Sequence, residues 1–119
     1  MDKKEWMRKI NAACKKAGTY QPQFKYVIET LAQIMEDRDK VHDQYVASGA
    51  KPTIIHTNKA KERNVVKNPM LVMEMELNAQ ALAYWRDLGL TPAGLKKLND
   101  DAMKPKKTSA LAEALRGID

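Results

Sequence analysis

A length of 119 residues is enough for one domain with a modest core and too short for two domains of ordinary size. Aromatic residues make up only 6% of the chain while Ala, Leu, Met, Lys and Glu dominate, so the composition favours helices. The formal charge of +6 suits a polyanionic partner as well as ordinary solubility, and a single cysteine excludes an intrachain disulfide.

No motif indicates a catalytic, metal or membrane site. His42 and His56 fall in different predicted elements without ligand-spaced companions, whereas structural zinc takes four ligands. The sequence contains no glycine-rich phosphate loop and no Ser-His-Asp or Cys-His arrangement. No stretch reaches the roughly 18 apolar residues of a membrane span. We therefore expect an intracellular protein that is not an enzyme, takes no metal or cofactor and engages no membrane.

Residues 2–17 predict a short amphipathic helix that ends at Gly18. Its apolar residues, Trp6, Ile10 and Cys14 among them, recur at i, i+3 and i+4. Six basic residues surround this apolar stripe: Lys3, Lys4, Arg8, Lys9, Lys15 and Lys16. We predict that these cations lie along DNA phosphates, where each neutralised phosphate releases counterions. A solvated helix that docks through Trp6 and Ile10 is a second interpretation, compatible with the first.

Residues 21–47 predict the longest helix, with Pro22 in its first turn and Ser48-Gly49 as its stop. The apolar stripe thins in the second half, where acidic residues crowd together. This stretch predicts a solvated face or an ion-paired subunit contact. It does not predict a magnesium site, because carboxylates on one helix radiate outward instead of converging. The carboxylates concerned are Glu36, Asp37, Asp39 and Asp43.

Residues 49–69 change character, with the short apolar pairs Ile54-Ile55 and Val65-Val66 among polar residues. A connection of about 20 residues in a small domain indicates a function of its own or mobility. Four basic residues here are candidate DNA contacts: Lys59, Lys61, Arg63 and Lys67. Two interpretations stay open, a basic arm that orders on DNA and a mobile crossover between two helices.

The next helix is predicted to begin with Asn68 as its N-cap and Pro69 in its first turn. Its broad apolar face is expected to cover the stripe of the long helix, so that the two form an antiparallel hairpin. That face comprises Met70, Leu71, Met73, Leu77, Ala81, Leu82, Trp85 and Leu88. Gly89 suits a left-handed helix end, and Thr91-Pro92 cap and start another helix. Further apolar residues are predicted to pack back on the preceding helix: Leu90, Leu95 and Leu98.

The corner at residues 88–98 has a competing interpretation. Its glycine, Thr-Pro and leucines look like the turn of a DNA-binding helix-turn-helix, with Lys96 and Lys97 on the recognition helix. That motif needs a small residue four positions before Gly89, where this chain has Trp85. Because an indole there would force the helices apart, we favour a structural joint over base readout by this turn.

Residues 104–119 are predicted to form a basic linker and a short amphipathic tail helix, with Leu111 and Leu115 as partner-binding residues. A helix this short is marginal in water, so we expect it to fold on a partner or on a neighbouring subunit. The chain then divides into a helical domain for DNA binding and oligomerisation, residues 1–103, and the tail, residues 104–119.

Four short segments form a pattern between residues 45 and 98. They are YVASG at 45–49, TNK at 57–59, KNP at 67–69 and LGLTPAGLKKL at 88–98. In order and spacing they resemble the small subunit of the DNA-packaging terminase of tailed phages and prophages. That family often has Ser-Arg where this chain has Ala93-Gly94.

The resemblance implies an all-α, ring-forming, non-enzymatic protein in the cytoplasm of the infected bacterial host. It implies recognition of double-stranded viral DNA at the packaging start site and recruitment of the large terminase subunit, an ATPase and nuclease. A ring also remedies a small core, because a neighbouring subunit can cover apolar surface that two long helices leave open. Two alternatives remain, a dimeric helix-turn-helix regulator and a protein-interaction scaffold without a DNA role.

Overall fold

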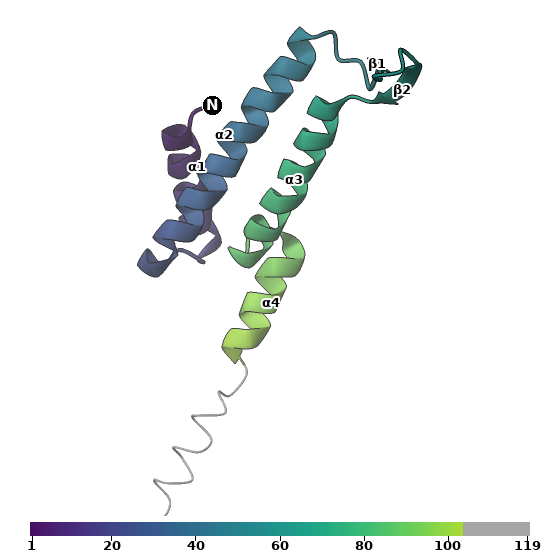
Figure 1. Cartoon of the computed structure of the whole chain (residues 1–119). Helices are drawn as coiled ribbons and strands as arrows, with labels where there is room; N and C mark the ends of the chain where they lie inside the picture. The colour runs from purple at the N-terminus through teal and green to yellow at the C-terminus, as the bar shows by residue number, and fades with distance from the viewer. Residues whose placement is uncertain (104–119) are drawn as a thin grey trace, which may run out of the picture.

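The computed structural model describes the backbone of residues 1–103 and the side chains of residues 1–101. This part of the chain is mostly helical, as predicted, and contains one small antiparallel sheet (Figure 1). The elements are α1 (Lys3–Ala17), η1 (Pro22–Phe24), α2 (Lys25–Ala47), β1 (Thr53–Thr57), β2 (Arg63–Lys67), α3 (Pro69–Asp87) and α4 (Pro92–Met103). The two strands correct the all-α prediction.

The long helices α2 and α3 lie side by side and antiparallel, which confirms the predicted hairpin, and α1 packs against α2 (Figure 1). The buried apolar residues gather where these three helices meet: Ile10, Cys14, Ile28, Leu31, Ala32, Met35, Ala81 and Leu88. All four that belong to α2 lie in its first half. Among the described residues, the second half of α2 and the first half of α3 bury no apolar side chain fully.

The helix boundaries follow local hydrogen-bond chemistry. Asn68 caps α3, because its side-chain oxygen accepts from the backbone N–H of Met70 at 3.0 Å. Thr91 caps α4 in the same way, its hydroxyl accepting from the N–H of Gly94 at 3.0 Å. Both N-caps confirm the predictions.

The segment interpreted as a basic arm or a mobile crossover contains a β-hairpin. Ile54 pairs with Val66 and Ile55 with Val65. The turn closes with a hydrogen bond from the N–H of Lys61 to the carbonyl oxygen of Asn58 (3.0 Å), and Lys61 adopts a left-handed conformation with φ of 61°. This is the three-residue hairpin loop that normally places glycine at the left-handed position.

Helix α3 is less buried than its apolar sequence predicted. Met73 and Leu82 were expected to face α2, yet they are 50% and 49% exposed, and Met75 is 63% exposed. The physical reason is that the apolar side chains of α3 project from most sides of the helix, whereas α2 covers only one side of it. Apolar surface of this kind is normally covered by another element.

The corner between α3 and α4 is tight because two glycines line it. Gly89 has φ of 71°, and a Cβ there would stand 2.6 Å from a methyl carbon of Leu98. A Cβ on Gly94 would overlap the backbone carbonyl oxygen of Arg86, so the two helices touch backbone to backbone. Trp85 does not lie in this crossing, which corrects the steric objection raised from sequence: its ring packs edge-on against Trp6 of α1, with centroids 6.5 Å apart.

Candidate nucleic-acid interface

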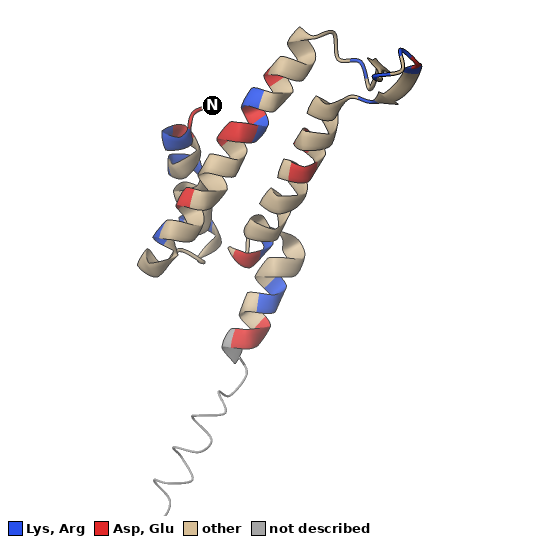
Figure 2. Ribbon diagram, viewed as in Figure 1, with Lys and Arg blue, Asp and Glu red and all other residues tan. Residues whose placement is uncertain are grey.

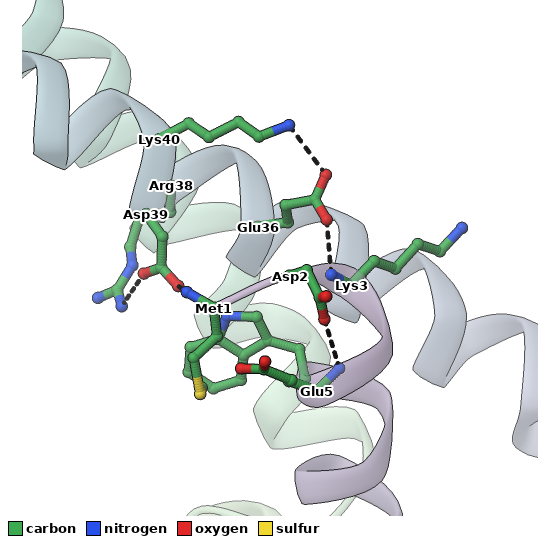
Figure 3. Close-up of polar contacts among 9 residues, drawn as sticks. Met1, Asp2, Lys3, Glu5, Glu36, Arg38, Asp39 and Lys40 are labelled. Carbon is green, nitrogen blue, oxygen red and sulfur yellow. Dashed lines mark hydrogen bonds and ion pairs between the residues drawn. The ribbon is translucent and has the colours of Figure 1, made fainter.

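Polar contacts fix the start of α1 against the middle of α2. The indole Nε1 of Trp6 donates to Asp39 Oδ2 at 2.7 Å, and the guanidinium of Arg38 donates to the other oxygen at 2.8 Å. The backbone N–H of Lys3 donates to Glu36, which also accepts from Lys40 at 3.1 Å (Figure 3). Glu36 and Asp39, two carboxylates of the stretch expected to be a solvated face or a subunit contact, thus hold α1 within the same chain.

These contacts shift the pKa values of both carboxyls. Burial raises the pKa of Asp39, but the hydrogen bonds from Trp6 and Arg38 outweigh burial and bring it below its usual value. For Glu36, the hydrogen bond from Lys40 and then the one from the Lys3 backbone lower the pKa. Both carboxylates are therefore stabilised in their ionised form when α1 is docked.

Lys3 is set apart from the other predicted DNA contacts on α1. Its ammonium pairs with Glu29 of α2 at 3.0 Å, and its side chain is one-third exposed. A cation that already faces a carboxylate gains less from a phosphate. The structure therefore places Lys3 in the contact between α1 and α2.

Three of the predicted cations share one exposed side of α1. Lys4, Arg8 and Lys15, with Asn11 between them, follow the spacing i, i+4, i+7 and i+11 and line one shallow groove. We call Lys4, Arg8 and Lys15 the basic stripe. Asn11 is a polar member of this groove that the sequence did not single out, although its i+7 spacing from Lys4 placed it there.

Within residues 1–101, no carboxylate lies within the 4.0 Å of an ion pair from any of the three stripe cations. Lys15 instead lies over the ring of Tyr20, with its ammonium 4.9 Å from the centroid. The charges of the stripe are therefore available to an anion. Lys9 and Lys16 are also exposed. At 3.6 residues per turn, however, Lys9 lies about 100° around the helix from Arg8, and Lys16 lies about 100° from Lys15.

The hairpin gathers the second set of predicted cations at the far end of α2 (Figure 2). Lys59 and Lys61 lie in its turn, while Arg63 and Lys67 bound β2. All ten strand residues are exposed. The two basic regions, α1 and the hairpin, thus lie far apart on one subunit, with the acidic middle of α2 between them.

The third set lies on α4, where Lys96 and Lys97 are exposed. Lys97 borders a groove at the corner, together with Arg86 and the carboxylates Asp87 and Asp101. The two carboxylates weaken the electrostatic attraction between this groove and phosphate. The predicted partner-binding residues Leu111 and Leu115, and the boundary of the tail, lie outside the described residues.

Across the described part of the chain, no three His, Cys, Asp or Glu side chains converge as a metal site. No helix there has both the length and the hydropathy needed to cross a membrane.

Comparison with known proteins adds one match. A family model described as phage terminase, small subunit, matches residues 3–104, which include all the described helices and the hairpin. No curated protein and no solved structure matches the chain.

Proposed function

The chain belongs to the phage terminase small subunit family, and on this premise we propose that it is a non-catalytic oligomeric subunit that binds double-stranded viral DNA. Family membership supports a role in phage DNA packaging. The finer proposal is that the protein forms a ring, recognises the packaging start site, and recruits and regulates the large ATPase-nuclease subunit in the cytoplasm of the infected host.

The basic stripe is the observation that carries the DNA-binding proposal. From Lys4 to Lys15 it extends about 16 Å along α1, at 1.5 Å per residue. Phosphates of one DNA strand are spaced about 3.4 Å along the duplex axis, so a stripe of this length reaches several of them. Arg8 adds a planar guanidinium that suits bidentate contact with phosphate.

Repetition around an oligomer would turn weak contacts into firm binding. A few phosphate contacts per subunit give modest, salt-sensitive affinity. Several copies engaging one duplex raise the overall affinity by effective concentration, without any new contact. Recruitment of the large subunit is assigned to residues 104–119 on the sequence of the tail alone.

The experiment that tests this function measures DNA binding and oligomer mass with the full chain. Fluorescence anisotropy would compare a duplex from the packaging start region with a scrambled duplex, and light scattering would give the mass of the free protein. We expect an oligomer larger than a dimer that prefers the start-region duplex. A monomer at tens of micromolar would overturn the ring, and no detectable binding of either duplex at low salt would favour a protein-interaction scaffold.

A dimeric helix-turn-helix regulator is the second candidate. The observation that favours it is the close approach of α4 to α3 at Gly94, with Trp85 turned toward α1 and Lys96 and Lys97 exposed. This function requires a dimer whose base preference relaxes in the variant Lys96→Ala/Lys97→Ala. A uniform loss of affinity across sequences, with a smaller salt slope, would count against it.

A further inference from the structure

The two faces of the β-hairpin differ in chemistry. The strand register places Ile55 opposite Val65, Thr57 opposite Arg63 and Thr53 opposite Lys67, and alternate residues share a face. One face therefore has an apolar centre, Ile55 and Val65, between two cations, Arg63 and Lys67; we call these four residues the arm face. The opposite face consists of Ile54, His56, Asn64 and Val66 and contains no Lys, Arg, Asp or Glu.

The apolar centre of the arm face is exposed in the described part of the chain. Ile55 is 58% exposed and Val65 is 74% exposed. Asn68 holds the base of the hairpin, because its backbone N–H donates to the carbonyl of Pro52 and its amide Nδ2 to that of Lys51, both at 2.9 Å. The hairpin thus projects from the end of the α2–α3 pair (Figure 1). An isolated two-stranded ribbon is marginally stable in water, so a partner that covers it would stabilise it.

A groove between α2 and α3 has the complementary chemistry. Val41, Met73 and Leu77 supply its apolar lining, and the carboxylates of Asp37 and Glu76 border it. We call these five residues the shaft groove.

The charge of the shaft groove is not neutralised within the described residues. Lys40 also lines the groove, but its ammonium pairs with Glu36 at 3.1 Å. Asp37 accepts a hydrogen bond from the neutral amide of Gln33 at 3.1 Å, and among residues 1–101 no cation lies within ion-pair distance of Asp37 or Glu76. The groove therefore presents an apolar floor with unpaired negative charge at its border.

We propose that the arm face of one copy packs into the shaft groove of a neighbouring copy. The proposal rests on the oligomeric function proposed above and names the surfaces that make the contact. Ile55 and Val65 would cover Met73 and Leu77, while Arg63 and Lys67 would meet Asp37 and Glu76. The contact also covers the part of the α2–α3 pair that buries no apolar side chain fully.

The match of apolar centre to apolar floor favours a protein partner over DNA for this face. Phosphates would engage the cations but would leave Ile55 and Val65 in water, with no gain from burial. The contact joins two different surfaces, so each copy gives one arm and receives one. Head-to-tail contacts of this kind generate closed rings when the rotation between copies closes.

The test measures how the mass of the full-length oligomer depends on concentration, by light scattering and native mass spectrometry. Ile55→Ser/Val65→Ser alters the arm face, and Ile54→Ser/Val66→Ser alters the opposite face as the matched control. We expect the arm-face variant to dissociate at a concentration at least about tenfold higher than the wild type, which is the loss expected for removing apolar anchors from an interface. The control should dissociate at a concentration within about threefold of that of the wild type, since its substitutions leave the contact in place. An equal effect of both variants, or no effect of the first, would overturn the proposal.

A charge exchange tests the pairing directly and guards against simple misfolding. Arg63→Glu/Lys67→Glu and Asp37→Lys/Glu76→Lys should each weaken the oligomer, because like charges then face each other. The protein that combines all four substitutions should associate at least about tenfold more tightly than either parent variant, since opposite charges face each other again. If the combined variant is as weak as either parent, the proposed pairing is wrong. If the wild type itself is monomeric, the oligomeric function fails as well; an oligomer indifferent to these variants overturns the pairing alone.

Discussion

The indole nitrogen of Trp6 and the carboxylate of Asp39, 33 residues apart in sequence, are joined by a 2.7 Å hydrogen bond that ties the first turns of α1 to the middle of α2. Further along α1, Ile10 and Cys14 are completely buried in the shared core. Polar contacts at one end and apolar packing along its length thus fix the rotation of α1. That rotation turns the basic stripe toward solvent and Lys3 toward Glu29.

The variant Trp6→Phe should destabilise the protein by about 1–3 kcal/mol, because it removes a hydrogen bond to a carboxylate while keeping much of the ring packing. The measurement is the free energy of unfolding from urea titration. Asp43→Asn is the control, since Asp43 is exposed on α2, the helix that carries Asp39; it should change stability by less than about 0.5 kcal/mol. An equal effect of the two substitutions would show that the Trp6 contact adds no stability.

Stability should fall in acid because α1 docks against ionised carboxylates. In the folded state the pKa values of Asp39 and Glu36 lie below their ordinary values of 3.8 and 4.5. The unfolded chain therefore takes up protons at higher pH than the folded chain does. The stability contributed by these groups is complete above roughly pH 5 and is lost as the pH falls through the folded-state pKa values.

Urea unfolding between pH 7 and pH 3 checks this dependence. Asp39→Asn does not titrate at position 39, so its free energy of unfolding should fall less steeply below about pH 4 than that of the wild type. Parallel curves for the two proteins would mean that Asp39 does not contribute to the acid sensitivity.

Substitutions of Asn68 should separate its two roles. Asn68→Ala removes both the cap on Met70 and the donor to Lys51, and we expect a loss of about 1–3 kcal/mol. Asn68→Asp keeps the acceptor for Met70 but loses the donor, so hydrogen exchange should accelerate in β1 and β2 and much less in the first turn of α3. Asn78→Ala, at an exposed position of α3, is the control. If Asn68→Asp accelerates exchange equally in both regions, the division of roles is wrong.

The variant Gly94→Ala should destabilise the joint between α3 and α4. Helix propensity alone predicts that the free energy of unfolding rises by up to about 1 kcal/mol, whereas overlap with the Arg86 carbonyl predicts that it falls by about 1–3 kcal/mol. Because the steric term is larger, hydrogen exchange of the α4 amides should accelerate. Asp100→Ala, at an exposed position of the same helix, should leave exchange unchanged or slow it. Slower exchange in Gly94→Ala would contradict the close approach.

The helix boundaries could be predicted from sequence because their causes are local. Asn68 and Thr91 cap the helices that follow them, and Gly89 ends α3 in the left-handed conformation, all through groups within three residues. The hairpin was missed for a physical reason. Its strands are five residues long and exposed on both faces, so they show no alternation of apolar and polar residues, and Lys61 occupies the turn position where glycine would signal a hairpin.

Tertiary contacts, which no local sequence pattern contains, decide which cations of α1 face solvent and which face α2. The sequence identifies the cations of α1 but not which of them face α2, so it does not distinguish Lys3 from Lys4 and Arg8. The spacing of Trp85 from Gly89 predicts a position in the α3–α4 crossing, whereas its actual partner, Trp6, lies 79 positions earlier in the chain. Both outcomes depend on how α1 docks.

The central claim, that the basic stripe binds DNA, is tested most directly by the salt dependence of duplex binding. The stripe variant is Lys4→Ala/Arg8→Ala/Lys15→Ala. A control of equal charge change is Lys9→Ala/Lys16→Ala/Lys25→Ala, at exposed positions outside the stripe. The plot of the logarithm of the association constant against the logarithm of salt concentration has a negative slope. The magnitude of this slope should decrease in the stripe variant by about 2.7 for each subunit that contacts the duplex, and by less than about 1 in the control. Equal decreases in both variants, or an unchanged slope in the stripe variant, would contradict the account.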